Sequence, residues 1–204
     1  MKRIIMLVVL AMALPLTAFA TTIDFGNNNG TITGTSNTLS LSGDVIGSVS
    51  GLGTGGCSVA VSCGTVTFTT GVLSSGNMMT GTSLFAAGGT FTITGNGNDG
   101  VPNGVIFQGS FTGTTQWVNA GTLPNGSTVY DLIGTVSGTW YNGTKVSGAT
   151  TQMAVVAGPN GFTGSATALS GDTFISTTPE PGTLGLLGTG LVGLAGIVRK
   201  KLKA

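Results

Sequence analysis

Two short stretches, Thr65-Val66-Thr67-Phe68-Thr69 and Thr90-Phe91-Thr92-Ile93-Thr94, decide the fold of this chain. Each alternates strictly between threonine and an apolar side chain, the period-two pattern of a strand with one buried face. Thr38-Leu39-Ser40-Leu41-Ser42 repeats the alternation. These patterns predict strands that place hydroxyl groups on one face and a hydrophobic core on the other.

Similar strand-like runs follow one another between residues 21 and 176. The predicted runs are 21–34 (as a first edge strand), 38–42, 44–50, 58–61, 65–69, 90–94, 105–111, 115–118, 129–133, 135–141, 151–157 and 165–175. Asn-Gly pairs predict turns at 29–30, 103–104, 125–126, 142–143 and 160–161. Only residues 78–87 could form a short helix. The expected fold is all-β, an antiparallel β-sandwich or jelly-roll-like body.

A β-solenoid is the alternative fold, because Gly-Thr-Phe/Val-Thr fragments recur along the chain. Their spacing is uneven, and a solenoid needs a repeat of fixed length. The sandwich is therefore the first expectation.

The two ends of the chain have the composition of targeting segments. Lys2 and Arg3 precede an apolar run, and Ala18-Phe19-Ala20 is a signal-peptidase pattern, so residues 1–20 are predicted to be a secretory signal peptide with cleavage after Ala20. Residues 183–198 carry no charge and predict a transmembrane helix, although a bilayer core is usually spanned by about 20 residues. Residues 199–204 form a basic tail that should stay in the cytoplasm, with Arg199, Lys200, Lys201 and Lys203.

The segment between these ends is acidic. Between Thr21 and Pro181 six acidic residues stand against one basic residue, Lys145, which gives a net charge of −5. A surface with a single cation cannot neutralise phosphates, so no nucleic-acid partner is expected.

A linker at 177–182 contains Pro179-Glu180-Pro181. With the Gly/Leu-rich span and the basic tail behind it, this segment resembles the PEP-CTERM sorting signal of exosortase substrates in Gram-negative bacteria. The resemblance implies export through the inner membrane, transient anchoring and processing by exosortase near the Pro-Glu-Pro motif, with the protein ending on the outer surface or outside the cell. Family members are associated with exopolysaccharide and biofilm. The resemblance does not extend to residues 21–176.

No enzymatic activity, cofactor or metal is expected from the residues themselves. The chain has no histidine, which excludes Ser-His-Asp and Cys-His catalysis and the usual zinc sites. A carboxylate-dependent glycoside hydrolase is the less favoured alternative, and its acid pair would have to come from Asp44, Asp99, Asp131 and Asp172. The segment 96–100, Asn-Gly-Asn-Asp-Gly, fits a turn better than a calcium loop.

Cys57 and Cys63 lie six residues apart in an exported segment. In an oxidising compartment they are expected to form a disulfide, which would contribute about 2–3 kcal/mol. Free reactive thiols are the alternative.

Aromatic residues offer a third kind of site. Trp117, Trp140 and Tyr141 could contact a glycan on an exposed face, and core packing is the favoured alternative for such strand residues. The overall expectation is a structural or adhesive component of the extracellular polysaccharide or biofilm matrix. A carbohydrate-binding module is the alternative function.

Overall fold

A computed structural model describes residues 21–52, 57 and 61–177 of the 204-residue chain. Residues 21–177 form a compact unit of their own. The predicted signal peptide, most of the linker with Pro179, Glu180 and Pro181, the predicted transmembrane helix and the basic tail lie outside the described residues. Among the residues that are described, no helix is long and apolar enough to span a membrane.

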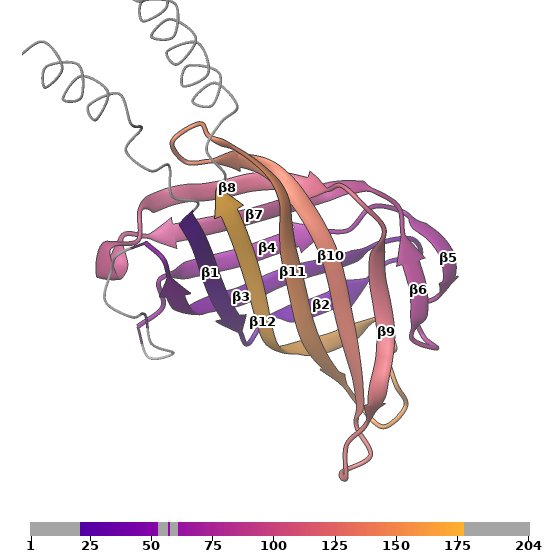
Figure 1. Cartoon of the computed structure of the whole chain (residues 1–204). Helices are drawn as coiled ribbons and strands as arrows, with labels where there is room; N and C mark the ends of the chain where they lie inside the picture. Colours follow the sequence, from indigo (N-terminus) through magenta and orange to yellow (C-terminus); the bar gives the residue numbers. More distant parts are fainter. Residues whose placement is uncertain (1–20, 53–56, 58–60, 178–204) are drawn as a thin grey trace, which may run out of the picture. The chain divides into compact units, whose positions relative to one another are not determined.

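The described unit consists of twelve β-strands and one 3₁₀ turn (Figure 1). The elements are β1 Thr21–Asn28, β2 Thr31–Gly34, β3 Leu39–Ser50, β4 Gly64–Thr69, β5 Leu73–Asn77, β6 Thr82–Phe85, β7 Gly88–Asn96, η1 Asn98–Gly100, β8 Asn103–Phe111, β9 Thr115–Thr122, β10 Thr128–Trp140, β11 Lys145–Ala157 and β12 Ser165–Thr177. All their pairings are antiparallel.

The sheet closes on itself because its first and last strands pair. β1 lies against β12 from Thr21↔Thr177 to Asn27↔Gly171, and β2 continues along β12 in the same register to Thr33↔Ser165. On its other side, the same interrupted strand pairs with β3. β12 also pairs with β11, which pairs with β10. The ring then returns through β8, β7 and β4 to β3.

The ring therefore has eight places around its circumference and is an antiparallel barrel. Some of these places are filled by two strands that lie end to end, as β1 and β2 do along β12. β4 and β7 pair with each other, and their continuations β5 and β6 also pair, so the four strands form one bent hairpin. β8 and β9 pair one after the other with the same edge of β10. β6 pairs with β9 as β7 pairs with β8. β5, β6 and β9 thus extend the sheet beyond the closed ring, as Figure 1 shows.

The expected all-β class is confirmed, but the sandwich, the jelly roll and the solenoid are wrong. A sandwich needs two separate sheets, whereas here the β1–β12 pairing joins everything into one closed sheet. The predicted edge strand at 21–34 is the strand pair that closes the ring. The predicted helix at 78–87 is also wrong, because these residues form a turn and β6.

The core fills the inside of the barrel. An eight-stranded barrel has an interior just wide enough for side chains to fill. Inward-facing apolar residues from the strands form one cluster, and at its centre lie Phe68, Phe91, Phe107 and Phe111, whose ring centroids are 5.7 to 6.1 Å apart in neighbouring pairs. The threonines between them face outward, where Thr65, Thr67 and Thr69 pair with Thr94, Thr92 and Thr90.

The Asn-Gly turns are confirmed at three of the five predicted positions. Gly126, Gly143 and Gly161 have positive φ angles of 85°, 88° and 73° at turns between strands, a conformation that glycine adopts without strain. The pair at 103–104 instead begins β8, and the pair at 29–30 interrupts the strand formed by β1 and β2. These two turn predictions are therefore wrong.

Candidate functional site

Cys57 and Cys63 form the expected disulfide, with an S–S distance of 2.03 Å. The bridge lies in the connection between β3 and β4. Asn96 and Asn98 tie this connection to the end of β7, because their side-chain amides donate to the carbonyl of Ser62 at 2.6 and 3.0 Å. The bridge closes a loop within the β3–β4 connection, and the two asparagine amides hold this connection against η1. The segment 96–100 is confirmed as a turn.

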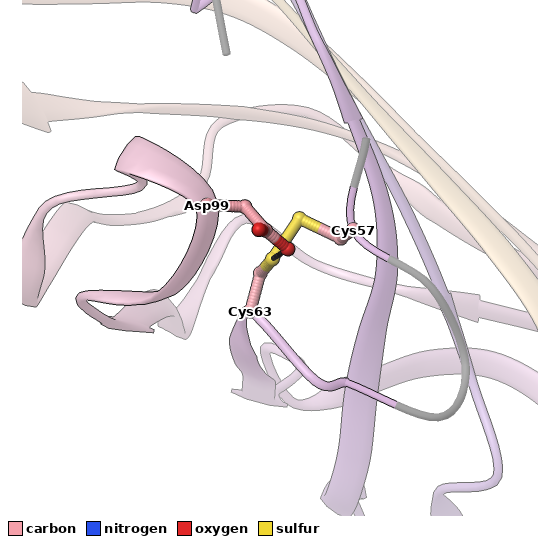
Figure 2. A group of neighbouring side chains, drawn as sticks. All are labelled: Cys57, Cys63 and Asp99. Atoms are coloured by element: carbon pink, nitrogen blue, oxygen red, sulfur yellow. Dashed lines mark hydrogen bonds between the residues drawn. A yellow bond between two sulfur atoms is a disulfide. The ribbon is translucent and has the colours of Figure 1, made fainter. Parts of the chain in front are cut away.

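Asp99 of η1 points towards this disulfide, as Figure 2 shows. Its Oδ2 lies 3.7 Å from Cys63 Sγ, and the two sulfurs and the carboxylate together lie within 4.8 Å of one another. A disulfide sulfur carries no hydrogen, so the contact is not a hydrogen bond. Thiolates are the sulfur species that bind metals, and both sulfurs are used by the bridge. The disulfide therefore has a structural role in closing the β3–β4 connection.

A second polar cluster lies inside the barrel, where Asp44 of β3 is fully buried. Asn27 of β1 donates a hydrogen bond from its side-chain amide to Asp44 Oδ2, and Asp44 Oδ1 has no hydrogen-bond partner among the described residues. Gly30 and Gly171 make room for this pair. A Cβ on Gly30 would lie 2.5 Å from Asp44 Cβ, and one on Gly171 would lie 2.6 Å from the Asn27 amide nitrogen.

Two backbone irregularities turn Asp44 inward. Asn29 and Gly43 have φ angles of 67° and 68°, and both fall between the neighbouring pairs Asn28↔Val45 and Thr31↔Ser42. Along β3 the inward positions change from Leu39 and Leu41 to Asp44 and Ile46. Ser42 and Gly43 are two consecutive outward residues that interrupt the alternation of β3, and this shift places the carboxyl group of Asp44 in the core.

Burial raises the pKa of Asp44 from its usual value of 3.8 to about 6. The hydrogen bond from Asn27 and those from the backbone N–H groups of Gly30 and Val45 oppose the rise, since they favour the ionised form. Desolvation is the larger effect. Between about pH 4 and pH 6, the folded protein therefore keeps a proton on a carboxyl group that the unfolded chain would release.

The outer face of β1, β11 and β12 carries a group of exposed side chains that sequence reasoning missed. Phe174 is 47% exposed and lies opposite Asp24 on one side and Thr150 on the other. Asp172, two residues earlier on β12, lies opposite Gln152. We call Asp24, Thr150, Gln152, Asp172 and Phe174 the Phe174 surface.

Within the Phe174 surface, the charge of Asp172 acts on the carboxyl group of Asp24. The pKa of Asp24 is raised, first by partial burial and second by the negative charge of Asp172. Asp24 Oδ1 has no hydrogen-bond partner among the described residues. That oxygen atom is buried, so the surface presents the Asp172 carboxylate, the Gln152 amide and the Thr150 hydroxyl group around an exposed aromatic ring, beside the half-buried Asp24.

The predicted glycan contacts at Trp117 and Trp140 are wrong, and the favoured alternative of core packing is confirmed for both. Trp117 is fully buried, its ring stacks on Tyr130 at a centroid distance of 4.8 Å, and its Nε1 donates to the carbonyl of Met78 at 3.0 Å. Trp140 packs inside against Phe25. Of the three aromatic residues, Tyr141 alone is on the surface, 55% exposed, at the start of the turn that follows β10.

The four aspartates considered for hydrolysis lie in different surroundings. Asp44 is inside the barrel, Asp99 faces the disulfide, and Asp131 lies on β10. Asp172 has Asp24 as its acidic neighbour. The sequence offered no sign of this pairing, because residues 24 and 172 meet only through the closure of the barrel.

Comparison with known proteins identifies the end of the chain. Residues 177–200 match the family model of the PEP-CTERM protein-sorting motif. No curated protein and no solved structure matches the chain. The chain is an all-β barrel that carries a PEP-CTERM sorting signal, which implies an exported protein of the cell surface or extracellular space with exosortase as its processing partner.

The buried Asp44 predicts a stability that falls as pH rises. The pKa of Asp44 is about 6 in the folded protein and 3.8 in the unfolded chain, so the folded state binds the proton more tightly. The resulting contribution to the free energy of unfolding is fully present below pH 4 and is lost as the pH rises through 6. The free energy of unfolding should fall by about 3 kcal/mol at most between pH 4 and 7. Urea denaturation across this range measures it.

Asp44→Asn should remove most of this pH dependence, because an amide does not titrate. Asp24, whose pKa is also raised, leaves a smaller slope of the same sign. Ser42→Asn on the exposed side of β3 is the control and should keep the wild-type slope. An unchanged slope in Asp44→Asn would show that this carboxyl group is not responsible.

Proposed function

We propose that this protein is a non-enzymatic structural or adhesive component of the extracellular polysaccharide or biofilm matrix of a Gram-negative cell. The observation that carries the proposal is the PEP-CTERM match at residues 177–200, since this signal places the protein outside the cell. The absence of histidine from the sequence and the separate surroundings of Asp44, Asp99 and Asp131 support a role without catalysis.

The proposed route to the surface uses both ends of the chain. Residues 1–20 direct export and are removed after Ala20, residues 183–198 anchor the protein in the membrane, and residues 199–204 keep the tail in the cytoplasm. Pro179 and Pro181 fix their φ angles and lack backbone donors. Exosortase recognises the segment before the anchor through Pro179, Glu180 and Pro181.

Loss of the motif should leave the protein in the membrane. In cells that contain exosortase, Glu180→Ala should reduce release of the barrel into the medium at least about tenfold, a change of about 1.4 kcal/mol in recognition. Immunoblots of membrane and culture fractions measure this. Asp131→Ala is the control, because Asp131 is an acidic residue of β10 outside the Phe174 surface. Equal release from Glu180→Ala and wild type would contradict the assigned role of the motif.

A carbohydrate-binding role is the second candidate, and the Phe174 surface favours it. Sugars present apolar C–H faces beside hydroxyl donors. The exposed Phe174 ring supplies an apolar platform, while Asp24, Asp172 and Gln152 supply acceptors around it. The two carboxylates would repel uronic acids, so the expected ligand is a neutral polysaccharide.

Phe174→Ala should weaken binding to neutral polysaccharide about tenfold, which corresponds to loss of one buried aromatic contact of roughly 1.5 kcal/mol. Co-sedimentation of the full chain, purified in detergent, with the host's exopolysaccharide measures the change. Leu169→Ala is the matched control, since Leu169 is an exposed apolar residue of the same strand, 59% exposed. Equal loss of binding in the two variants would mean that no specific contact forms at Phe174.

A further inference from the structure

One strand edge of the described unit is open. β5 is the last strand in the order of the sheet, and it pairs only with β6. Among the described residues no other strand lies along its outer side, where the single backbone hydrogen bond is from Leu73 N to Asn37 O at 2.7 Å. Ser74, Ser75, Gly76 and Asn77 are all exposed. Backbone N–H and C=O groups therefore point outward along the rest of β5.

Few of the usual protections of an exposed edge are present here. Natural proteins blunt open edges with charged residues, proline or bulges. Residues 71–87 contain no charged residue and no proline. β5 does have an irregularity between Leu73 and Ser75, and Gly76 has a positive φ of 85°, while residues 75–77 keep their register with Leu84, Ser83 and Thr82 of β6. The exposed apolar side chains of Val72, Met79 and Leu84 surround this edge.

We propose that β5 is a self-association edge, along which a second copy of this chain adds its own β5 in antiparallel orientation. Two identical edges brought together antiparallel are related by a two-fold axis and form a closed dimer. The sheet would run from β6 and β5 of one copy into β5 and β6 of the next. This is the strand-addition mode of recognition, in which backbone hydrogen bonds supply the contact.

The charge distribution favours a second copy as the occupant. The exported segment carries −5, so most approaches of two copies bring like charges together. The hairpin of β5 and β6 is neutral, whereas Asp24, Asp131 and Asp172 lie on β1, β10 and β12. Pairing through β5 therefore joins two acidic bodies where each has no charge. This inference does not depend on polysaccharide binding.

Ser75→Lys tests the proposal, because Ser75 is exposed on β5 opposite the exposed Leu84, and a lysine there blunts the edge. Sedimentation velocity of the full chain in detergent, over a concentration series, should show a wild-type dimer. The variant should need at least a tenfold higher concentration to dimerise. Thr67→Lys adds the same charge on the outer face of β4, which has partners on both sides, and should dimerise like wild type.

Hydrogen exchange separates this edge from association through the C-terminal segment. In wild type, the amides of residues 74–77 should become at least tenfold slower to exchange as the protein concentration rises. The same amides in Ser75→Lys should show no such change, and circular dichroism should confirm that the variant is folded. A dimer that persists in Ser75→Lys, amide exchange at 74–77 that is independent of concentration, or a wild-type monomer throughout would each overturn the proposal.

Discussion

The pairing of β1 with β12 is the constraint on which the rest of the structure depends. It joins the first and last strands of the described unit through seven consecutive residue pairs, from Thr21↔Thr177 to Asn27↔Gly171. Without this pairing, β1 and β12 would each have an open edge. The apolar face of the sheet would then be exposed, because its side chains would no longer enclose a common interior. With it, inward-facing residues from every part of the chain meet in one core.

Strand β3, which pairs with β1, contains the least favourable group in the core, the carboxyl group of Asp44. Asn29 and Gly43 take left-handed conformations between the same two neighbouring residue pairs and shift the alternation of β3, so that Asp44 faces inside against Asn27. A buried carboxyl group costs stability when ionised, which its raised pKa expresses. Asn27, together with the space left by Gly30 and Gly171, accommodates it. We call the β1–β12 pairing the seam of the barrel. Apolar packing of Ile23 and Phe25 stabilises this seam, and the titrating carboxyl group of Asp44 weakens the structure beside one of its ends.

Local signals in the sequence predicted much of this structure, and long-range pairing was what they could not supply. The Thr-x-Thr runs fix β4 and β7, three Asn-Gly pairs mark turns, and the spacing of Cys57 and Cys63 allows their bridge. Alternation alone is the same in a sandwich and in a barrel. Phe174 and Ile175 are consecutive apolar residues, and only the register against β1 decides that Phe174 faces outward.

The exported body and the sorting signal describe different parts of one function. Residues 177–200 give the route, whereas the filled barrel gives surfaces: the Phe174 surface, the rows of threonine on β4 and β7, and the open edge of β5. Because the interior is filled by side chains, the proposed contact with a matrix would use these outer faces.

Native-state hydrogen exchange tests the closure of the barrel most directly. The amides of Ile23–Phe25 in β1 and Thr173–Ile175 in β12 should open with the same free energy as those of β10 and β11, because a closed sheet unfolds as one unit. If the seam amides instead exchange through a local opening that is easier by about 1.4 kcal/mol or more, a tenfold difference, the barrel is not closed by β1 and β12.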